Sequence, residues 1–198
     1  MNNYYLPTQF EIEDEPFVIR NKGDYRTVLS CFNIISDIDL SDYEKSIALL
    51  LLFFENFDDV DDVLRCPYQK ELLEKMFWFF DCGQDYSADR NKPSLIDWDK
   101  DSMLVSSAIN AVAGKDVRAE EFVHWWTFIG YYMAIDGDCA LATIVTIRNK
   151  IARNEKLEKH EKKFKQENPH YFIRDYRTQE DKQVDDYIQA LWDSNGGE

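Results

Sequence analysis

A histidine beside two tryptophans is the most conspicuous candidate for chemistry in this sequence. His124 directly precedes Trp125 and Trp126 in a dense aromatic stretch. A catalytic imidazole needs a nucleophile, a metal ion or a second titratable group within hydrogen-bond reach, and the sequence offers no such partner at a recognisable spacing. Because a buried imidazole must also find a polar partner, we expect His124 to be a hydrogen-bonded core residue.

An acidic cluster and four cysteines are the remaining candidates for metal binding. The cluster Asp58, Asp59, Asp61 and Asp62 lacks both the tight-turn glycine and the downstream bidentate glutamate of a calcium loop, so we expect it to be solvated and to cap a helix. Cys31, Cys66, Cys82 and Cys139 are widely spaced, with no CxxC pair. We expect free thiols, mostly buried, in a reducing cytoplasm, and no metal site.

No sequence motif of a common enzyme class is present. The chain lacks a glycine-rich phosphate loop, a G-x-S-x-G elbow and an H-E-x-x-H metal motif. We therefore expect a protein that is not an enzyme and that has no cofactor and no catalytic residues.

The charge of the chain is strongly acidic and unevenly distributed. The formal net charge is −15 at pH 7 over 198 residues, which argues against nucleic-acid binding because phosphate contacts need clustered Lys and Arg. The whole net charge lies in residues 1–147. Residues 148–167 carry eight basic and four acidic side chains, and residues 168–198 carry three basic and seven acidic ones. The sequence thus indicates an acidic body, a basic helix and an acidic tail.

The basic helix supplies the candidate partner-binding residues. These are Arg148, Lys150, Arg153, Lys156, Lys159, Lys162 and Lys163. Three i,i+4 pairs, Glu155 with Lys159, Glu158 with Lys162 and Glu161 with Lys165, favour one exposed helix over residues 148–165 that projects from the body. The alternative interpretation is that this helix is merely a solvated charged face.

Hydrophobic periodicity predicts a mostly α-helical fold with a small N-terminal β-hairpin. The strands are expected at residues 10–12 and 17–19, and must pack on helices to be stable. Helices are expected at residues 25–36 after Asp24, from Ser41 with a capping box to Glu44, at 69–80, from Asp97 or Asp99 to 113, at 122–135, from about 139, and at 179–192. We expect an acidic helical core domain at residues 1–151, and a charged helix with an acidic tail at residues 152–198.

Two of these helices carry apolar faces that predict their surroundings. In the helix at 97–113, the residues expected to face inward are Leu104, Ala108, Ala111 and Val112. The helix at 122–135 is apolar on both faces, so we expect protein on most sides of it. One face comprises Phe122, Trp125, Trp126, Ile129, Tyr132 and Met133, and the other His124, Phe128 and Tyr131. The longest apolar run, residues 47–54, is too short to span a bilayer, and the first residues do not form a signal peptide.

The His124 stretch, HWWTF, resembles the bacteriophage gene-product-fifteen family, which tailed phages and prophages of Gram-positive bacteria encode. The likeness extends to DWDKD at 97–101, FFDCG at 79–83, IRNK at 147–150 and Asp24-Tyr25-Arg26, where the family has Asp-Phe-Arg. It covers about residues 6–167. The acidic tail after Tyr171 has no counterpart in the family pattern.

The resemblance implies a role in phage tail assembly and brings no catalytic residues. Family members are similar in genomic position to tail assembly chaperones, which coat the tape measure protein, recruit tail tube subunits and are absent from the finished virion. We therefore expect a chaperone in the cytoplasm of the bacterial host that binds the tape measure protein, the major tail protein or both. No nucleic acid or membrane is expected as a partner, and a homo-oligomer is left open.

Two other functions remain as alternatives. One is an acidic phage-encoded DNA mimic that inhibits a host DNA-binding protein; the charge of −15 favours it, and the basic residues at 148–167 weaken it. The other is a structural head-tail or tail component of the virion.

Overall fold

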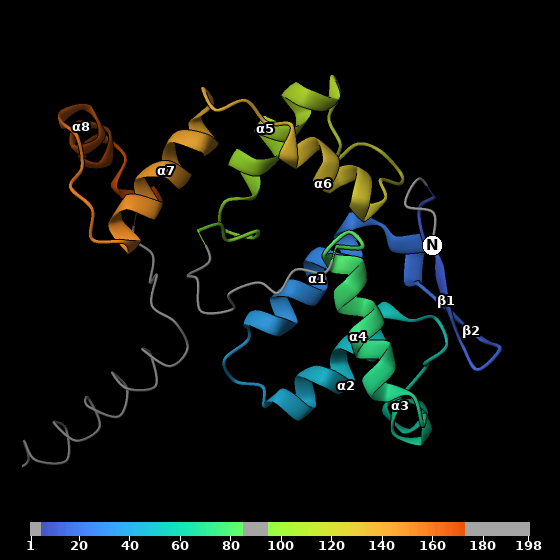
Figure 1. Cartoon of the computed structure of the whole chain (residues 1–198). Helices are drawn as coiled ribbons and strands as arrows, with labels where there is room; N and C mark the ends of the chain where they lie inside the picture. Colours follow the sequence, from blue (N-terminus) through green and yellow to red (C-terminus); the bar gives the residue numbers. More distant parts are fainter. Residues whose placement is uncertain (1–4, 85–94, 173–198) are drawn as a thin grey trace, which may run out of the picture. The chain divides into compact units, whose positions relative to one another are not determined.

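The computed structural model of this protein describes residues 5–84 and 95–172. In that part the chain is mostly α-helical with an N-terminal β-hairpin, as predicted (Figure 1). The elements are β1 Gln9–Ile12, β2 Glu15–Val18, α1 Tyr25–Ser36, α2 Asp42–Phe53, α3 Val60–Arg65, α4 Gln69–Phe80, α5 Ser102–Ala113, α6 Trp125–Met133, α7 Ala140–Ala152 and α8 Lys159–Glu167, with short 3-10 turns at Arg20–Gly23 and Pro169–Tyr171. The helix predicted at 179–192 lies outside the described residues.

Contacts group the chain into two compact units. The first unit comprises Met1–Ser87 and Trp98–Ile135, and the second comprises Ala88–Asp97 and Asp136–Glu198. The hairpin and α1 to α6 therefore belong to the first unit, and α7 and α8 to the second. The predicted division after residue 151 is a division into domains that fold independently. Units defined by contacts do not test independent folding, so that division stays a prediction.

The β-hairpin packs on the helices of the first unit, as predicted. Its two turn residues, Glu13 and Asp14, have φ of 50° and 67°, which suits a two-residue turn between twisted strands. Phe10 and Phe17 face each other across the strands. Both rings meet Phe54 edge-on, with centroids 6.3 and 6.2 Å apart. These contacts bury the apolar face that two strands alone would leave in water.

Several helices of the first unit begin where the sequence predicts. The Asp24 side chain caps α1 by accepting from the Arg26 amide, and Ser41 and Glu44 form the predicted capping box of α2. The acidic cluster caps a helix, as predicted, because Asp59 accepts from the Asp62 amide at 3.0 Å. That helix, α3, is only six residues long and was not itself expected.

The predicted inward face of α5 is partly wrong. Ala108 is buried as predicted and Leu104 is half-buried, but Ala111 and Val112 are exposed, and the other buried residues are Val105 and Ile109. The helix begins at Ser102 after Asp101 and not after Asp97 or Asp99. The apolar residues of α5 extend beyond its packed face, so apolar character alone does not identify that face. That face is set by contacts with α6, a tertiary interaction.

The prediction that protein surrounds the helix at 122–135 is also wrong over much of its length. Of the aromatic residues on α6 itself, Trp125 and Phe128 are buried, while Trp126 and Tyr132 are only half-buried. Phe122 precedes the helix and is 46% exposed, and Met133 at its end is 73% exposed. The helix begins only at Trp125, so the predicted continuous face includes residues outside it.

The single basic helix predicted at 148–165 is two helices, and this corrects the prediction. Asn154 adopts a left-handed φ of 55°, its amide donates to the Ile151 carbonyl, and the Glu155 amide donates to the Lys150 carbonyl at 2.8 Å. This pair of bonds is a Schellman motif, which ends α7. A second capping box between Glu158 and Glu161 then starts α8. The capping contacts at the end of α7 and the start of α8 divide the segment in which three i,i+4 Glu–Lys pairs were predicted on one helix.

Candidate interaction site

His124 is a structural residue at the start of α6. Its Nδ1 accepts from the Trp126 amide at 3.1 Å, so Nε2 carries the proton and donates to the Pro7 carbonyl, also at 3.1 Å. The side chain is buried, and this burial lowers the pKa of His124 below its ordinary value. The prediction of a hydrogen-bonded core histidine is confirmed.

The two tryptophans after His124 bind the end of another helix. The Trp125 indole N–H donates to the Phe80 carbonyl at 2.9 Å, and the Trp126 indole N–H donates to the Phe79 carbonyl at 2.8 Å. These carbonyls belong to the last turn of α4, where a helix has no donors of its own to offer. The Phe79 carbonyl also accepts from the Cys82 amide at 3.1 Å, so the indoles add to the capping of α4 and join α6 to it.

Asp24 joins the start of α1 to the segment that precedes α6. Its carboxylate accepts from the Val123 amide at 2.9 Å and from the Arg26 guanidinium at 3.0 Å. The neighbouring Gly23 has φ of 78°, and a Cβ atom there would lie 2.6 Å from Cζ of Phe79. This close approach requires glycine. The aromatic stretch and its polar partners thus form a scaffold that joins α1, α4 and α6.

The described ranges contain little else that could do chemistry. No three His, Cys, Asp or Glu side chains gather there in a way that could hold a metal ion. All four cysteines are free, as predicted; Cys31 is buried, which raises the pKa of its thiol to about 12, and the other three are half-buried. Within the same ranges, no helix combines the length and apolar character needed to cross a bilayer.

The predicted partner-binding residues lie in the second unit, and two of them have internal roles. Arg148 is buried, and its guanidinium donates to the carbonyls of Leu95 at 3.0 Å and Tyr171 at 2.7 Å. Lys150 donates to the Glu161 carboxylate at 2.6 Å. This bond raises the pKa of Lys150 and lowers that of Glu161, whose carboxylate also accepts from the Glu158 amide. Arg148 and Lys150 hold the second unit together.

The other five predicted residues are exposed. Arg153 and Lys156 lie at the end of α7 and in the segment that follows it, and Lys159, Lys162 and Lys163 lie on α8. Arg153 and Lys163 have nearby carboxylates, at 3.9 Å from Glu155 and 3.7 Å from Glu167. Among residues 5–84 and 95–172, no carboxylate lies within ion-pair distance of Lys156, Lys159 or Lys162.

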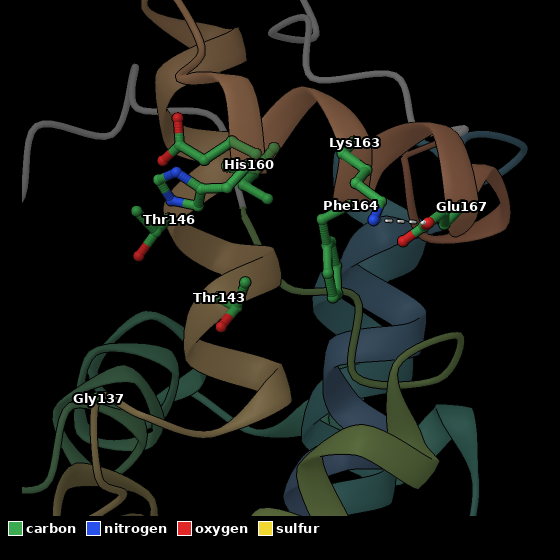
Figure 2. A pocket seen from close by; sticks show the side chains of 9 residues that line it. Gly137, Thr143, Thr146, His160, Lys163, Phe164 and Glu167 are labelled. Atoms are coloured by element: carbon green, nitrogen blue, oxygen red, sulfur yellow. Dashed lines mark ion pairs between the residues drawn. The ribbon is translucent and has the colours of Figure 1, made fainter.

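A groove runs between α7 and α8, and of these five cations Lys163 lines it. We call it the α7–α8 groove; it is lined by Gly137, Thr143, Thr146, Ile147, His160, Glu161, Lys163, Phe164 and Glu167, and its volume is about 460 Å³. Figure 2 shows Thr143 and Thr146 on α7 and His160, Lys163 and Phe164 on α8 around it. Ile147 and Phe164 give the groove an apolar component, whereas Lys163, Glu167 and Glu161 give it charge. This combination suits protein binding more than catalysis.

Comparison with known proteins identifies the family of this chain. The profile of the bacteriophage Gp15 protein family matches residues 3–172, which is most of the chain. The chain belongs to the bacteriophage Gp15 family. Comparisons with curated proteins and with solved structures gave no match. The Gp15 match includes the HWW scaffold and the α7–α8 groove, and it ends at the last described residue.

Sequence reasoning identified the cations of this Gp15 protein but not the groove beside them. Thr143, Thr146 and Ile147 repeat at i, i+3 and i+4 on α7, and His160 and Phe164 repeat at i and i+4 on α8. These spacings are the signal that could have been used. These spacings indicate a groove only when residues 148–165 are divided into two helices at Asn154, since one continuous helix cannot form a groove with itself.

Proposed function

We propose that this Gp15 family protein is a tail assembly chaperone. Its partner in this proposal is the phage tape measure protein, the major tail protein or both, and its role is binding without catalysis. The observation that carries the proposal is the α7–α8 groove, a partly apolar channel between two helices whose lining includes the exposed Lys163. Such a groove suits an amphipathic helix, whose anchors repeat at i, i+3 or i+4, and i+7.

The charge distribution supports the same proposal. A long helical partner with exposed apolar stripes aggregates until the tail tube encloses it. A chaperone that covers part of such a helix and carries a large net charge keeps the complex dissolved by repulsion. Here residues 1–147 carry a net charge of −15, so binding through the basic residues at 148–167 leaves acidic surface facing solvent.

A pull-down from co-expressing cells tests this proposal. The full chain carries a tag and is the bait, and the tape measure protein encoded by the same phage is co-expressed as the prey. We expect the tape measure protein to co-purify with the wild-type chain, and recovery to fall when Lys156, Lys159 and Lys162 are changed to Glu. The matched control reverses Lys45, Lys70 and Lys75 on α2 and α4 of the first unit. Equal recovery from both triple variants would contradict binding through α8.

Analysis of purified particles separates the chaperone from a structural tail component. A chaperone leaves before the virion is complete, so mass spectrometry of purified phage should detect none of this chain. Stoichiometric amounts in the particles would instead establish a structural component. The DNA mimic makes a third prediction, namely that the isolated protein displaces DNA from a host DNA-binding protein at physiological salt.

A further inference from the structure

We propose that the α7–α8 groove takes an amphipathic helix of a partner protein with one acidic flank, on which two carboxylates lie one helical turn apart. The inference deepens the proposed function, on which it rests, by naming the chemistry of the partner segment. Three features of the second unit carry it: an uncharged wall on α7, a row of cations on α8, and the engagement of the groove's own carboxylates.

The α7 wall of the groove is uncharged. It comprises Gly137 before the helix and Thr143, Thr146 and Ile147 on it or within it. The Thr143 hydroxyl donates to the Cys139 carbonyl at 3.1 Å, so its hydrogen is already used. Ile147 is only 1% exposed and lies at the base of the groove. One side of a partner helix can pack on this wall without burying an unpaired charge.

The open apolar surface of the groove lies on α8. Phe164 is half-buried, and one side of its ring is held by Phe172, which meets it edge-on with centroids 6.3 Å apart. The ring also lines the groove, and Figure 2 shows it across from Thr143. A partner helix can therefore place an apolar side chain against Phe164, as anchors do in other helix-binding grooves.

The cations of the α8 wall form a row. Lys159 and Lys163 are four residues apart on one helix, so their Cβ atoms lie about 5 to 6 Å apart on the same stripe. Both side chains are exposed, and Lys163 lines the groove. Carboxylates at i and i+4 of a partner helix have the same spacing. Both can therefore reach these ammonium groups when the two helices lie side by side.

The carboxylates of α8 do not neutralise this row. Both oxygens of Glu161 are engaged elsewhere: Oε1 accepts from Lys150 at 2.6 Å, and Oε2 accepts from the backbone amide just before α8 at 2.8 Å. Glu167 lies 3.7 Å from Lys163, but both side chains are exposed, and such pairs are weak. Among residues 5–84 and 95–172, no carboxylate lies within ion-pair distance of Lys159. With respect to that part of the chain, the row keeps its positive charge.

The negative charge elsewhere in the chain restricts an acidic partner to a local contact. Residues 1–147 carry a net charge of −15, which repels an acidic protein at long range. Salt screens exposed charges beyond about 8 Å at physiological ionic strength, so the row on α8 acts on carboxylates that are already close. The partner segment should therefore be acidic on one flank and not over its whole surface.

Selection of helical peptides by the full-length protein tests this chemistry without any phage protein. The displayed library has a constant apolar stripe at i, i+3, i+4 and i+7 and random residues on both flanks. We expect the wild type to enrich helices with Asp or Glu at i and i+4 of one flank. The double variant Lys159→Glu with Lys163→Glu should enrich Lys or Arg there instead. The matched control, Lys70→Glu with Lys75→Glu on α4, should select like the wild type.

The affinity of one selected peptide gives the size of the effect. Fluorescence anisotropy compares it with a matched peptide in which Gln replaces the two acidic residues. The acidic peptide should bind the wild type about two- to tenfold more tightly, because exposed ion pairs are weak. This advantage should disappear when NaCl rises from about 0.05 to about 0.5 M. Thr146→Trp, at an exposed position, fills the groove without adding charge and should weaken both peptides about tenfold.

Four results would overturn the proposal. Enrichment of no helix would show that the groove does not take one, and enrichment of a basic or uncharged flank by the wild type would contradict the assigned chemistry. Unchanged binding of both peptides to Thr146→Trp would place them outside the groove. A wild-type dimer in size-exclusion chromatography that Thr146→Trp dissociates would assign the groove to a second copy.

Failure of the proposed function gives a different result. If the tape measure protein does not co-purify but the wild type still enriches acidic flanks, the partner chemistry of the groove stands and the role in tail assembly is contradicted.

Discussion

The two units of this protein use their polar side chains in different ways. In the first unit, long donors bind carbonyls at the ends of helices: the Trp125 and Trp126 indoles serve α4, and Arg20 donates to Leu51, Leu52, Phe54 and Phe57 at the end of α2. In the second unit, Lys156, Lys159 and Lys162 are exposed, and no carboxylate of residues 5–84 or 95–172 lies within ion-pair distance of them. The difference separates polar groups that join helices from polar groups that face solvent.

Arg148 is the exception in the second unit, because it acts like the donors of the first. It is buried and holds carbonyls from two distant segments, at Leu95 and Tyr171. The four predictions below test whether the distinction between scaffold and surface is real. They run from the largest expected change in stability to the smallest.

Trp125→Ala should be the most damaging of these substitutions. The indole is 2% exposed, packs against Phe32, Trp98 and Phe128, and donates to the Phe80 carbonyl. We expect the free energy of unfolding to fall by about 3 to 5 kcal/mol, measured by urea denaturation with circular dichroism. Trp126→Ala, at a half-buried position, should cost about 2 kcal/mol. Equal losses in the free energy of unfolding would mean that the difference in burial between Trp125 and Trp126 does not affect stability.

Arg148→Met should destabilise the protein by about 2 to 4 kcal/mol. Methionine keeps much of the aliphatic volume but leaves the Leu95 and Tyr171 carbonyls without this donor. Arg153→Met is the matched control, since Arg153 lies at the end of the same helix with its side chain 63% exposed. Arg153→Met should change the free energy of unfolding by no more than about 0.5 kcal/mol. Similar effects of the two would place Arg148 on the surface after all.

His124 should make stability depend on pH. Burial lowers its pKa in the folded protein below the ordinary value, so between these two pKa values the unfolded chain binds more protons. The stability contribution is complete above pH 6.5 and is lost as the pH falls below it. We expect urea midpoints of the wild type to decline between pH 7 and pH 5 more steeply than those of His124→Asn. Asparagine can cap α6 without titrating, and the other histidines are unchanged in this control.

Charge reversal at Lys156, Lys159 or Lys162 should have the smallest effect on stability. Each side chain is exposed, so each single change to Glu should alter the free energy of unfolding by no more than about 0.5 kcal/mol. The melting temperature of each variant, measured by differential scanning fluorimetry, tests this. A loss of several degrees would show that these lysines stabilise the second unit, and a binding defect in the triple variant would then not identify a surface.

Local signals in the sequence predicted the beginnings of elements well. The Asp24 cap and the Ser41 and Glu44 capping box each depend on a few neighbouring residues. The packed faces of α5 and α6 were not predictable in the same way. On both helices apolar residues extend beyond the packed face, so neighbours distant in sequence decide which of them are buried.

The candidate site was predicted in part, for a similar reason. Exposed lysines follow from composition, whereas the groove depends on the left-handed Asn154, a conformation that few residues other than glycine adopt. The internal role of Arg148 depends on carbonyls 53 and 23 residues away. Glu161, expected to pair with Lys165 one turn along, instead pairs with Lys150 across the groove's helices.

The indole bonds to α4 also have a consequence during synthesis of the protein. The donors follow their acceptors by 45 and 47 residues. At about 5 to 20 residues per second, a ribosome needs roughly 2 to 9 s to add them. Until then the Phe79 and Phe80 carbonyls lack their indole donors, and the junction between α4 and α6 cannot form.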